Sequence, residues 1–515
     1  MLLDQIIENA ARRAPDEPAI VTASASLSFA ELDARIDART AWLTRHTRPG
    51  DRVAILGENR IEYLECLYAA ARAGRIAAPV NHRLHPSEWR GLLMQCGAGL
   101  VIAEHPFATA LEPQLDGTGI EIHPFEIPQS RTATTPTEPR PPGRESTASA
   151  SRAPRAETDV AWLIATSGTT GLPKWAMLTH RSLTAGITNL ALARRIADDD
   201  VLLTPFPMCH VAVYNVLAFH LHARPVVLLT RFDADVMNQL IGQHRVRTLS
   251  LAPTMIASWL DAPSTATANL RSLRTVGYGA SAISAPVLVR AVRELGVDLS
   301  QGYGMTELSG NAVFLGPGEH RAAADGDERY LRAAGRAGPL VALKIVGDDG
   351  VEVAPGTPGE IWVRGDQVGA GYWNQPEATA ASFGDDGWFR TGDLGRIDGD
   401  GLVSIVDRKK DVLVTGGENV SSREVEQVLE HHPGVREVAV IGVTDVHWGE
   451  NVCAIVVPED RSHPPTLDEL VDFCRERLAG FKKPKHLVLI DELPKNATGK
   501  VQKAALRARY GSTSG

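Results

Sequence analysis

The sequence predicts an α/β fold, with a large N-terminal domain of doubly wound sheets that includes a small β-rich part, and a small α+β C-terminal domain. Helical patterns alternate with short apolar runs over residues 1 to 126 and again from residue 160. This alternation is typical of parallel sheets covered by helices. Short strand patterns separated by Gly and Asp then fill residues 335 to 407. At 515 residues, the chain is long enough for more than one domain.

The elements can be followed from the N-terminus. "MLLDQIIENAARRAPDEPAI" has an amphipathic helical pattern with acidic residues, and it lacks the basic start and apolar run of a secretory signal. Residues 51–57 read as a buried strand, 62–74 as a helix ending at Gly74, and 77–80 as the next strand. Further strands are expected in "VAWLIAT", "RPVVLL", "VRTLSLAP" and "LRTVGYGAS", with a helix from about His180.

Two segments read as surface loops. Residues 128–159 are rich in Pro, Ser, Thr, Ala and Arg without an apolar period, so they bury too little surface to offset the entropy of ordering. Residues 317–330 are also polar and are expected to form a loop. After "DRKKD" a compact α+β pattern begins, which places a domain boundary near Lys410: residues 1–409 form the first domain and 410–515 the second.

Composition narrows the class of protein. Hydrophobic residues make up 43% and charged residues 22%, as in ordinary soluble enzymes. The net charge of -9 argues against a nucleic-acid binder that relies on a broad basic field. No apolar stretch is long enough to span a bilayer. The five cysteines are scattered without a CxxC pair, which favours reduced thiols and a cytoplasmic location.

The stretch "TSGTTGLPKW" predicts a phosphate-binding loop. Small residues let backbone N–H groups converge on an anion, and hydroxyl groups and a lysine add further donors. The pattern differs from GxxxxGK[ST], so it does not indicate a P-loop NTPase. The residues of this predicted loop are Thr166, Ser167, Gly168, Thr169, Thr170, Gly171, Lys174 and Trp175.

Seven stretches occur in a fixed order along the chain. They are "TSGTTGLPK", "PMCHV", "GYGAS", "QGYGMTE", "GWFRTGDLG", "DRKKDVLVTGGENVSSREVE" and "PKNATGK". Together they closely resemble the adenylate-forming superfamily of acyl-CoA synthetases, adenylation domains and luciferases. The resemblance covers nearly the whole chain and is greatest to acyl- and aryl-CoA ligases, including the non-adenylating type from platensimycin-type diterpenoid antibiotic pathways.

The resemblance implies a two-step reaction. A carboxylate attacks ATP to give acyl-AMP and pyrophosphate, and the thiol of CoA then attacks the mixed anhydride. Between the steps the small C-terminal domain rotates about a hinge, which corresponds to Lys410. The substrates implied are a small carboxylic acid or its adenylate, ATP and coenzyme A, with Mg²⁺ wherever adenylation takes place.

The resemblance also implies roles for single residues. Lys500 would bridge the carboxylate and the α-phosphate, Thr306 would contact the α-phosphate, and Glu307 would bind magnesium. The AMP site would comprise Gly279, Ala280, Ser281, Gln301, Gly302, Tyr303, Gly304, Met305, Thr306, Asp393 and Arg408. Gly416 and Gly417 would line the pantetheine tunnel, with Trp448, Phe481 and Lys483 beside the CoA nucleotide. The acyl pocket would contain His210, Val211, Tyr214, Gly279, Ser281, Asn311 and Phe314. No basic residue in that set marks a second acidic group, which favours a bulky apolar or aryl acid.

Trp175 departs from the resemblance, because the family pattern "PKG" reads "PKW" here. Glycine permits unusual dihedrals and close approach of the backbone to phosphates. An indole would crowd the β- and γ-phosphates of ATP and spare AMP, which has neither. The sequence therefore predicts a ligase that adenylates poorly and takes its acyl-adenylate from elsewhere, such as a separate adenylating enzyme.

Three alternatives stay open at this point. The chain is a complete ATP-dependent acyl- or aryl-CoA synthetase, an adenylation enzyme that loads a carrier protein, or a catalytically silent protein that binds acyl-adenylates. Lys500, Glu307 and an outward swing of Trp175 on a mobile loop favour the first of these. A thiol tunnel and a hinge argue against the last.

Overall fold

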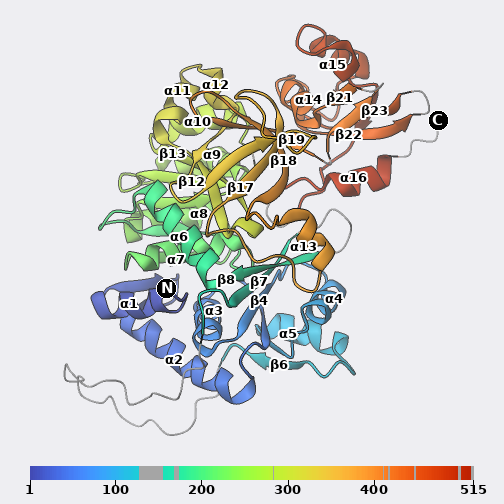
Figure 1. The fold of residues 1–515 in the computed structure, drawn as a ribbon. Coiled ribbons are helices and arrows are strands. Elements are labelled where there is room, and N and C mark those ends of the chain that lie inside the picture. The colour runs from blue at the N-terminus through green and yellow to red at the C-terminus, as the bar shows by residue number, and fades with distance from the viewer. Residues whose placement is uncertain are drawn as a thin grey trace.

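The computed structural model describes residues 1–126, 155–166, 173–281, 283–409, 411–415, 418–445, 448–496 and 500–511. In this part of the chain the strands form three sheets of thirteen, six and five strands. The two larger sheets belong to the large N-terminal part, and the five-stranded sheet belongs to a small C-terminal part beside it (Figure 1). The predicted α/β fold class is confirmed.

The six-stranded sheet has the order β6-β5-β3-β4-β7-β8 and is parallel except for the β7–β8 pair. Its strands are β3 (Arg52–Leu56), β4 (Ile76–Val80), β5 (Leu100–Ala103), β6 (Glu121–Pro124), β7 (Val160–Thr166) and β8 (Lys174–Thr179). Helices α1 (Gln5–Arg13), α2 (Phe29–His46) and α3 (Ile61–Ala73) contribute to the apolar cluster on one face, and α4 (Pro86–Cys96) and α5 (His105–Leu111) to the cluster on the other. The predicted end of α3 at Gly74 is confirmed, since Gly74 caps the helix with a left-handed φ of 70°.

The thirteen-stranded sheet combines a parallel and an antiparallel half. The half before β14 contains β1 (Pro18–Val21), β2 (Ser26–Ser28), β9 (Leu202–Thr204), β10 (Val226–Leu228), β11 (Thr248–Leu251), β12 (Thr275–Gly279) and β13 (Asp298–Met305). The antiparallel half contains β14 (Gly310–Leu315), β15 (Ala333–Ala337), β16 (Ala342–Val346), β17 (Gly359–Arg364), β18 (Phe389–Ile397) and β19 (Val403–Arg408). Helices α6 (His180–Arg194), α7 (Tyr214–Leu221), α8 (Ala234–His244), α9 (Pro253–Asp261), α10 (Ala285–Leu295) and α13 (Pro376–Ser382) connect these strands. The switch between the halves at β13–β14 lies next to the predicted site.

The five-stranded sheet forms the core of the C-terminal part. Its strands are β20 (Leu413–Thr415), β21 (Glu418–Val420), β22 (Val435–Asp445), β23 (Gly449–Pro458) and β24 (His486–Leu489), with helices α14 (Ser422–Leu429), α15 (Leu467–Cys474) and α16 (Lys503–Tyr510). Apolar side chains of β22 and β23 alternate between two clusters, so both faces of the sheet are covered. Across the predicted boundary, the carboxylate of Asp407 accepts hydrogen bonds from Ser421, Ser422 and the backbone N–H of Arg423 at the start of α14.

The prediction of a loop over residues 317–330 is wrong. The segment forms two helices, α11 (Pro317–Ala324) and α12 (Glu328–Leu331). Pro317 occupies the first turn of α11, where its missing N–H costs nothing. His320, Ala323 and Ala324 bury one side of that helix, so a short apolar stripe organises a segment whose overall composition is polar.

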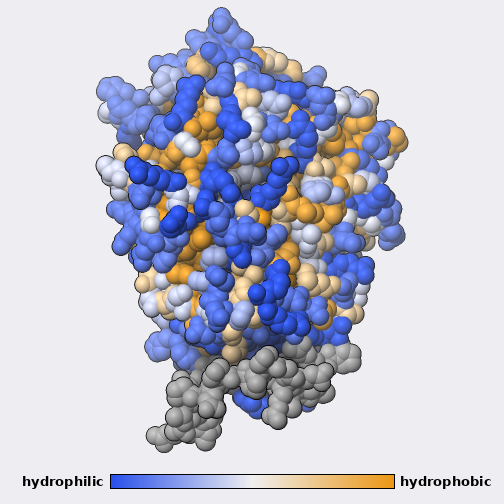
Figure 2. Space-filling model, turned by 90° about the vertical axis from the view of Figure 1, so that its left-hand side faces the viewer, coloured by the Kyte–Doolittle hydropathy of each residue, from blue (hydrophilic) through white to orange (hydrophobic). Residues whose placement is uncertain are grey.

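The exterior is mainly hydrophilic, with hydrophobic residues in scattered areas on the face shown in Figure 2. Within the residues that the structure describes, no helix is both long and apolar enough to cross a membrane. Most of the 128–159 segment lies outside the described residues.

Candidate active site

Three predicted nucleotide-binding residues meet where the middle of β18 lies beside the end of β19. Tyr303 on β13 donates its hydroxyl to Asp393 Oδ2 at 2.7 Å, and Arg408 Nε lies 2.6 Å from Asp393 Oδ1. Asp393 and Arg408 are also register partners across β18 and β19. Burial and the neighbouring Asp393 carboxylate raise the pKa of Tyr303. We call these residues the nucleotide cluster; their side chains are mutually fixed by hydrogen bonds before any ligand binds.

The remaining predicted AMP residues follow the adjacent ends of β12 and β13. Gly279 ends β12 and pairs in parallel with Gly302, while Gln301 to Met305 complete β13 and Thr306 begins a short 3-10 turn. Gly302 leaves room for Asn311, because a Cβ there would lie 1.8 Å from Asn311 Nδ2. The carboxyl ends of parallel strands at a change in strand order are a common ligand site in α/β proteins. Ala280 and Ser281 continue from this edge.

Glu307 and Lys174 converge on a residue that the sequence did not single out. The Tyr372 hydroxyl donates to Glu307 Oε1 at 2.9 Å, and Lys174 Nζ lies 4.8 Å from the centre of the Tyr372 ring. Tyr372 carries no motif of its own, and its segment is held here by an isolated bridge to Ala176 and by backbone hydrogen bonds to β8, such as that from the Met177 N–H to the Gly371 carbonyl. With Oε1 engaged, Glu307 has one carboxylate oxygen left to ligate a metal that phosphates and water also ligate, which fits the coordination of Mg²⁺.

Trp175 lies on a strand, so its assignment to a mobile loop is wrong. It is the second residue of β8, pairs with Ala165 of β7, and its carbonyl accepts from the Trp373 N–H at 2.8 Å. The indole has 0% exposure and belongs to the apolar cluster of Leu163 and Trp89, and its Nε1 has no hydrogen-bond partner. The side chain is thus held inside the protein immediately after the predicted phosphate loop.

Several predicted residues lie outside the described part of the chain. They are Ser167, Gly168, Thr169, Thr170 and Gly171 of the phosphate loop, Lys410, Gly416 and Gly417. Thr166, at the start of the loop, donates its hydroxyl to the Lys174 carbonyl at 3.2 Å, so the two ends of the loop are tied together.

The residues predicted for the acyl pocket come from three segments, of which the end of β12 with Gly279 and Ser281 is described above. His210, Val211 and Tyr214 surround the start of α7, and Asn311 and Phe314 lie on β14. Tyr214 is buried against Gly310, where a Cβ would lie 2.6 Å from the ring. Burial lowers the pKa of His210 to about 4 and raises that of Tyr214 to about 12. His210 Nε2 has no hydrogen-bond partner among the described residues, and the Tyr214 hydroxyl is approached by the Asn311 backbone N–H.

A basic residue that the predicted pocket set does not contain lies close to Tyr214. Arg194, the last residue of α6, donates from NH1 to Asn215 Oδ1 at 3.2 Å, directly beside Tyr214. It falls in no motif, and only the packing of α6 against α7 brings it to the pocket.

The predicted CoA residues lie on the surface of the C-terminal part. Trp448 is 53% exposed and Phe481 39%, the opposite of core aromatic residues, and Lys483 is half-buried. Gly449, next to Trp448, pairs with Thr415, the residue before the predicted tunnel glycines. Lys500 closes a local turn by donating its N–H to Asn496 Oδ1 at 2.9 Å. Exposed aromatic rings beside this hairpin suit a nucleotide bound at a surface.

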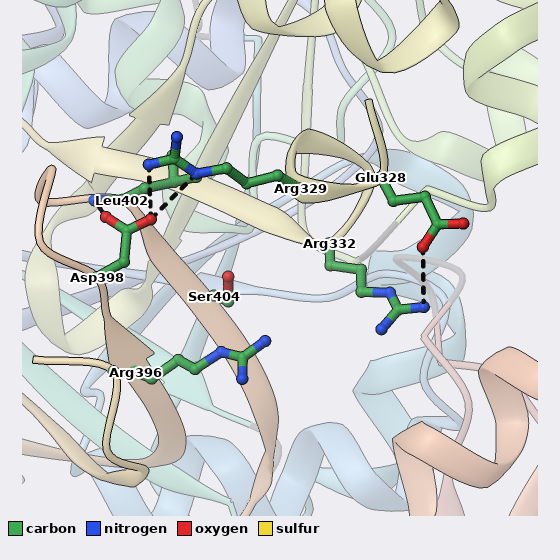
Figure 3. Close-up of a pocket in the computed structure, with 8 residues that line it drawn as sticks. Glu328, Arg329, Arg332, Arg396, Asp398, Leu402 and Ser404 are labelled. Atoms are coloured by element: carbon green, nitrogen blue, oxygen red, sulfur yellow. Dashed lines mark hydrogen bonds and ion pairs between the residues drawn. The ribbon is translucent and has the colours of Figure 1, made fainter. Parts of the chain in front are cut away.

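A separate cavity of about 470 Å³ lies between α12 and the β18–β19 pair. Figure 3 shows Arg329 bonded to Asp398 and Arg332 reaching Glu328, with Arg396 apart from both pairs. None of the predicted site residues lines it.

Comparison with known proteins decides the family. The model of the AMP-binding enzyme family matches residues 7–373, and that of the AMP-binding enzyme C-terminal domain matches residues 424–500. The chain belongs to the AMP-binding enzyme family. It is 36% identical over 505 residues to a feruloyl-CoA synthase of Amycolatopsis, covering 97% of each chain. It is also 36% identical over 523 residues to an indoleacetate–CoA ligase of Aromatoleum aromaticum, covering 98% of each.

Solved structures support the same assignment. The ATP-bound crystal structure of MatB from Rhodopseudomonas palustris superposes with a TM-score of 0.86 at 31% identity, covering 99% of each chain. The resemblance to the adenylate-forming superfamily is thereby confirmed, as is the prediction of an acid–thiol ligase of the acyl-CoA synthetase type. In this AMP-binding enzyme Asp393 contacts both Tyr303 and Arg408, and their role in binding the nucleotide stays a prediction.

Proposed function

We propose that this ligase joins CoA to a bulky apolar or aromatic acid supplied as an acyl-adenylate, and that Trp175 slows the ATP-dependent formation of that adenylate. The observation that carries the proposal is the complete burial of the Trp175 indole at the strand end that follows the phosphate loop. The family pattern that this chain resembles has glycine there, so the chain places its bulkiest side chain where phosphate needs the closest backbone approach.

The buried indole is held in place by its apolar surroundings. Fully burying a large apolar side chain contributes roughly 1.5–3 kcal/mol, which an outward swing into water would forfeit. A side chain anchored in this way cannot yield space to a further group without strain, at a cost of about 1–3 kcal/mol, and residue 175 also lacks the freedom of glycine to bring its backbone close to phosphate. We expect this to weaken contact with the β- and γ-phosphates of ATP and to spare AMP, because AMP ends at the α-phosphate.

The groups needed for thioester formation differ from those affected by Trp175. In this step the CoA sulfur attacks the acyl carbon, the C–O bond to phosphate breaks, and AMP leaves. We infer that residues 410–515 rotate about Lys410, that Gly416 and Gly417 admit pantetheine, and that Trp448, Phe481 and Lys483 lie beside the CoA nucleotide. The Asp407 contacts with Ser421 and Ser422 cross this boundary, so rotation would break them.

A complete ATP-dependent synthetase is the second candidate. Lys500 and Glu307 are both present, and Glu307 is oriented by Tyr372. In this role Lys500 would stabilise charge between the carboxylate and the α-phosphate, and Glu307 would hold Mg²⁺ against the phosphates. The ligase would then not depend on a separate adenylating enzyme.

The acid itself is inferred from the pocket and the relatives. Two relatives of comparable length are named for ferulic and indoleacetic acids, both aromatic. His210, Tyr214 and Phe314 provide aromatic surface in the pocket. We therefore expect an acid with a ring system rather than acetate.

The two half-reactions can be separated with ferulic and indoleacetic acids as probes. The wild-type chain receives either acid with ATP, Mg²⁺ and CoA, or the synthetic acyl-AMP with CoA, and thioester is measured by chromatography. We expect the acyl-AMP arm to be faster by about 10- to 100-fold, the factor that an overpacking cost of 1–3 kcal/mol implies. Equal rates in both arms would establish the complete synthetase. Exchanging CoA for a phosphopantetheinylated carrier protein identifies the acceptor.

Trp175→Gly supplies the matched variant. It is expected to raise acid-dependent turnover and leave acyl-AMP turnover within about twofold. Trp89→Ala is the control, since it opens the same apolar cluster without changing the residue after Lys174. A similar gain in both variants would mean that looser packing, not the position of the indole, limits adenylation.

A further inference from the structure

Arg194 places a partly buried positive charge beside the predicted acyl pocket. Its guanidinium lies against Gly277 on β12, where a Cβ would come within 2.6 Å of Cζ. Any side chain at position 277 would therefore clash with this guanidinium, and glycine avoids the clash. Gly279, two residues further along, belongs to the predicted pocket, so Arg194 lies under the same edge of the sheet.

The charge has no anionic partner in the part of the chain that the structure describes. Arg194 makes one hydrogen bond, from NH1 to the neutral carbonyl oxygen of Asn215, and its Nε has no partner. Desolvation lowers the pKa of the guanidinium, although the residue keeps some exposure to solvent. Arginine stays charged even so, and a partly desolvated charge without a counter-charge is costly.

Other polar groups beside Arg194 are also left without partners. Tyr214 interacts electrostatically with Arg194, and its buried hydroxyl, which the Asn311 backbone N–H approaches as a donor, has no acceptor of its own among the described residues. His210 Nε2, at the other end of the same turn, is unbonded as well. Buried polar atoms are rarely left unpaired in native structures, so several such atoms in one predicted pocket call for a ligand or water that pairs with them.

We propose that the acyl group carries an oxygen acceptor, a carbonyl or a second carboxylate, far from the reacting carboxyl, and that Arg194 binds it with help from the Tyr214 hydroxyl. This inference rests on the proposed function and names its substrate class: an oxygenated rather than a purely hydrocarbon acid. Arg194 acts here as a specificity-determining residue, because it touches the acyl group and not the reacting atoms.

The position of Arg194 at the C-terminal end of α6 does not by itself explain why its charged side chain turns inward. A helix C-terminus favours a cation, and Arg194 is the last residue of α6. Arg195, the next residue, has the same advantage and is exposed to solvent. Arg194 instead turns inward, toward Asn215 and Gly277, where a long side chain loses its hydration.

The test uses three synthetic acyl-adenylates with CoA: those of phenylpropanoic acid and of its para-acetyl and para-carboxy derivatives. The wild-type chain is expected to prefer at least one oxygenated derivative by about tenfold or more in kcat/KM, as is usual when a site pairs with a polar group of its substrate. The two derivatives distinguish a carbonyl from a carboxylate. Isothermal titration of the three free acids gives the same order of affinity without turnover.

Arg194→Met keeps the length of the side chain and removes the charge. It is expected to abolish the preference, in kcat/KM and in affinity, while phenylpropanoyl transfer persists. Arg195→Met is the matched control, and Arg194→Lys should restore part of a preference for the carboxylate. A preference that survives in Arg194→Met, or a wild-type chain that binds all three acids equally, would overturn the inference.

Failure of the proposed ligase function can be distinguished from failure of the inference about Arg194. Absence of thioester from every acyl-adenylate would reject the ligase step, and the titrations of the free acids would still decide the role of Arg194.

Discussion

The nucleotide cluster and the predicted acyl pocket differ in whether their polar groups have hydrogen-bond partners within the protein. In the nucleotide cluster, Asp393 accepts from Tyr303 and pairs with Arg408, so each group has a partner in the protein. In the predicted acyl pocket and beside it, His210 Nε2 and Arg194 Nε have no partner among the described residues.

We interpret this difference as one between nucleotide binding, which is common to the family, and the choice of acid, which is particular to each enzyme. A nucleotide is the same in every turnover, and a bonded cluster holds its groups at little entropic cost on binding. An acyl group varies among relatives, and unpaired buried groups penalise any ligand that fails to pair with them. We therefore expect the first region to set affinity for AMP and the second to set the choice of acid.

The largest expected effect comes from breaking the nucleotide cluster. Asp393→Asn removes the charge that Arg408 and the Tyr303 hydroxyl both contact, and truncating one partner of a buried charge pair costs about 2–5 kcal/mol. We expect KM for an acyl-adenylate to rise by about 10²-fold in steady-state assays of thioester formation.

Asp400→Asn is the control for this prediction. Asp400 is exposed and pairs with Arg329 at 2.6 Å, and such surface pairs contribute at most about 1 kcal/mol. The thermal midpoint of each variant shows whether it is folded. A KM within threefold of the wild-type value in folded Asp393→Asn protein would mean that the cluster is structural only.

Sequence motifs grouped the three residues that the structure brings into contact, because each of them lies in a fixed local pattern; that they bind a nucleotide stays a prediction. Tyr303 belongs to "QGYGMTE", Asp393 to "GDLG" and Arg408 to "DRKKD". Helix ends such as Gly74 were equally predictable, since they depend on local dihedrals.

Residues whose role depends on packing were missed. Tyr372 reaches Glu307 because its segment pairs with β8 beside Ala176, and Arg194 comes close to Tyr214 because α6 packs on α7. No local pattern encodes either contact. Trp175 was placed on a loop because glycines precede it, whereas pairing with Ala165 extends the strand to Lys174.

A smaller effect is expected on the pH dependence of stability, through His220, a buried histidine whose two ring nitrogens both have partners. In His220, Nδ1 lies 3.1 Å from the Tyr68 hydroxyl and Nε2 lies 3.0 Å from the Ala19 carbonyl, which suits the neutral ring. Burial lowers the pKa of both His220 and His210 to about 4. A lowered pKa stabilises the fold fully above the unfolded value of 6.5 and loses this contribution as the pH falls toward 4.

We expect His220→Asn to reduce the acid-dependent loss of the free energy of unfolding by about 1.4 kcal/mol per pH unit between pH 6 and 4.5. Urea unfolding at several pH values measures this slope. His463→Asn, at an exposed histidine, is the control and should leave the slope unchanged. An unchanged slope in His220→Asn would show that His220 titrates normally in the folded chain.

The central claim is that Trp175 admits a nucleotide with one phosphate and resists one with three. Isothermal titration of the wild-type chain with AMP and with ATP and Mg²⁺ tests it most directly. We expect AMP to bind and ATP to bind about 10- to 100-fold more weakly, with Trp175→Gly removing the difference. ATP binding to the wild-type chain as tightly as AMP would contradict the claim and leave a complete ATP-dependent synthetase.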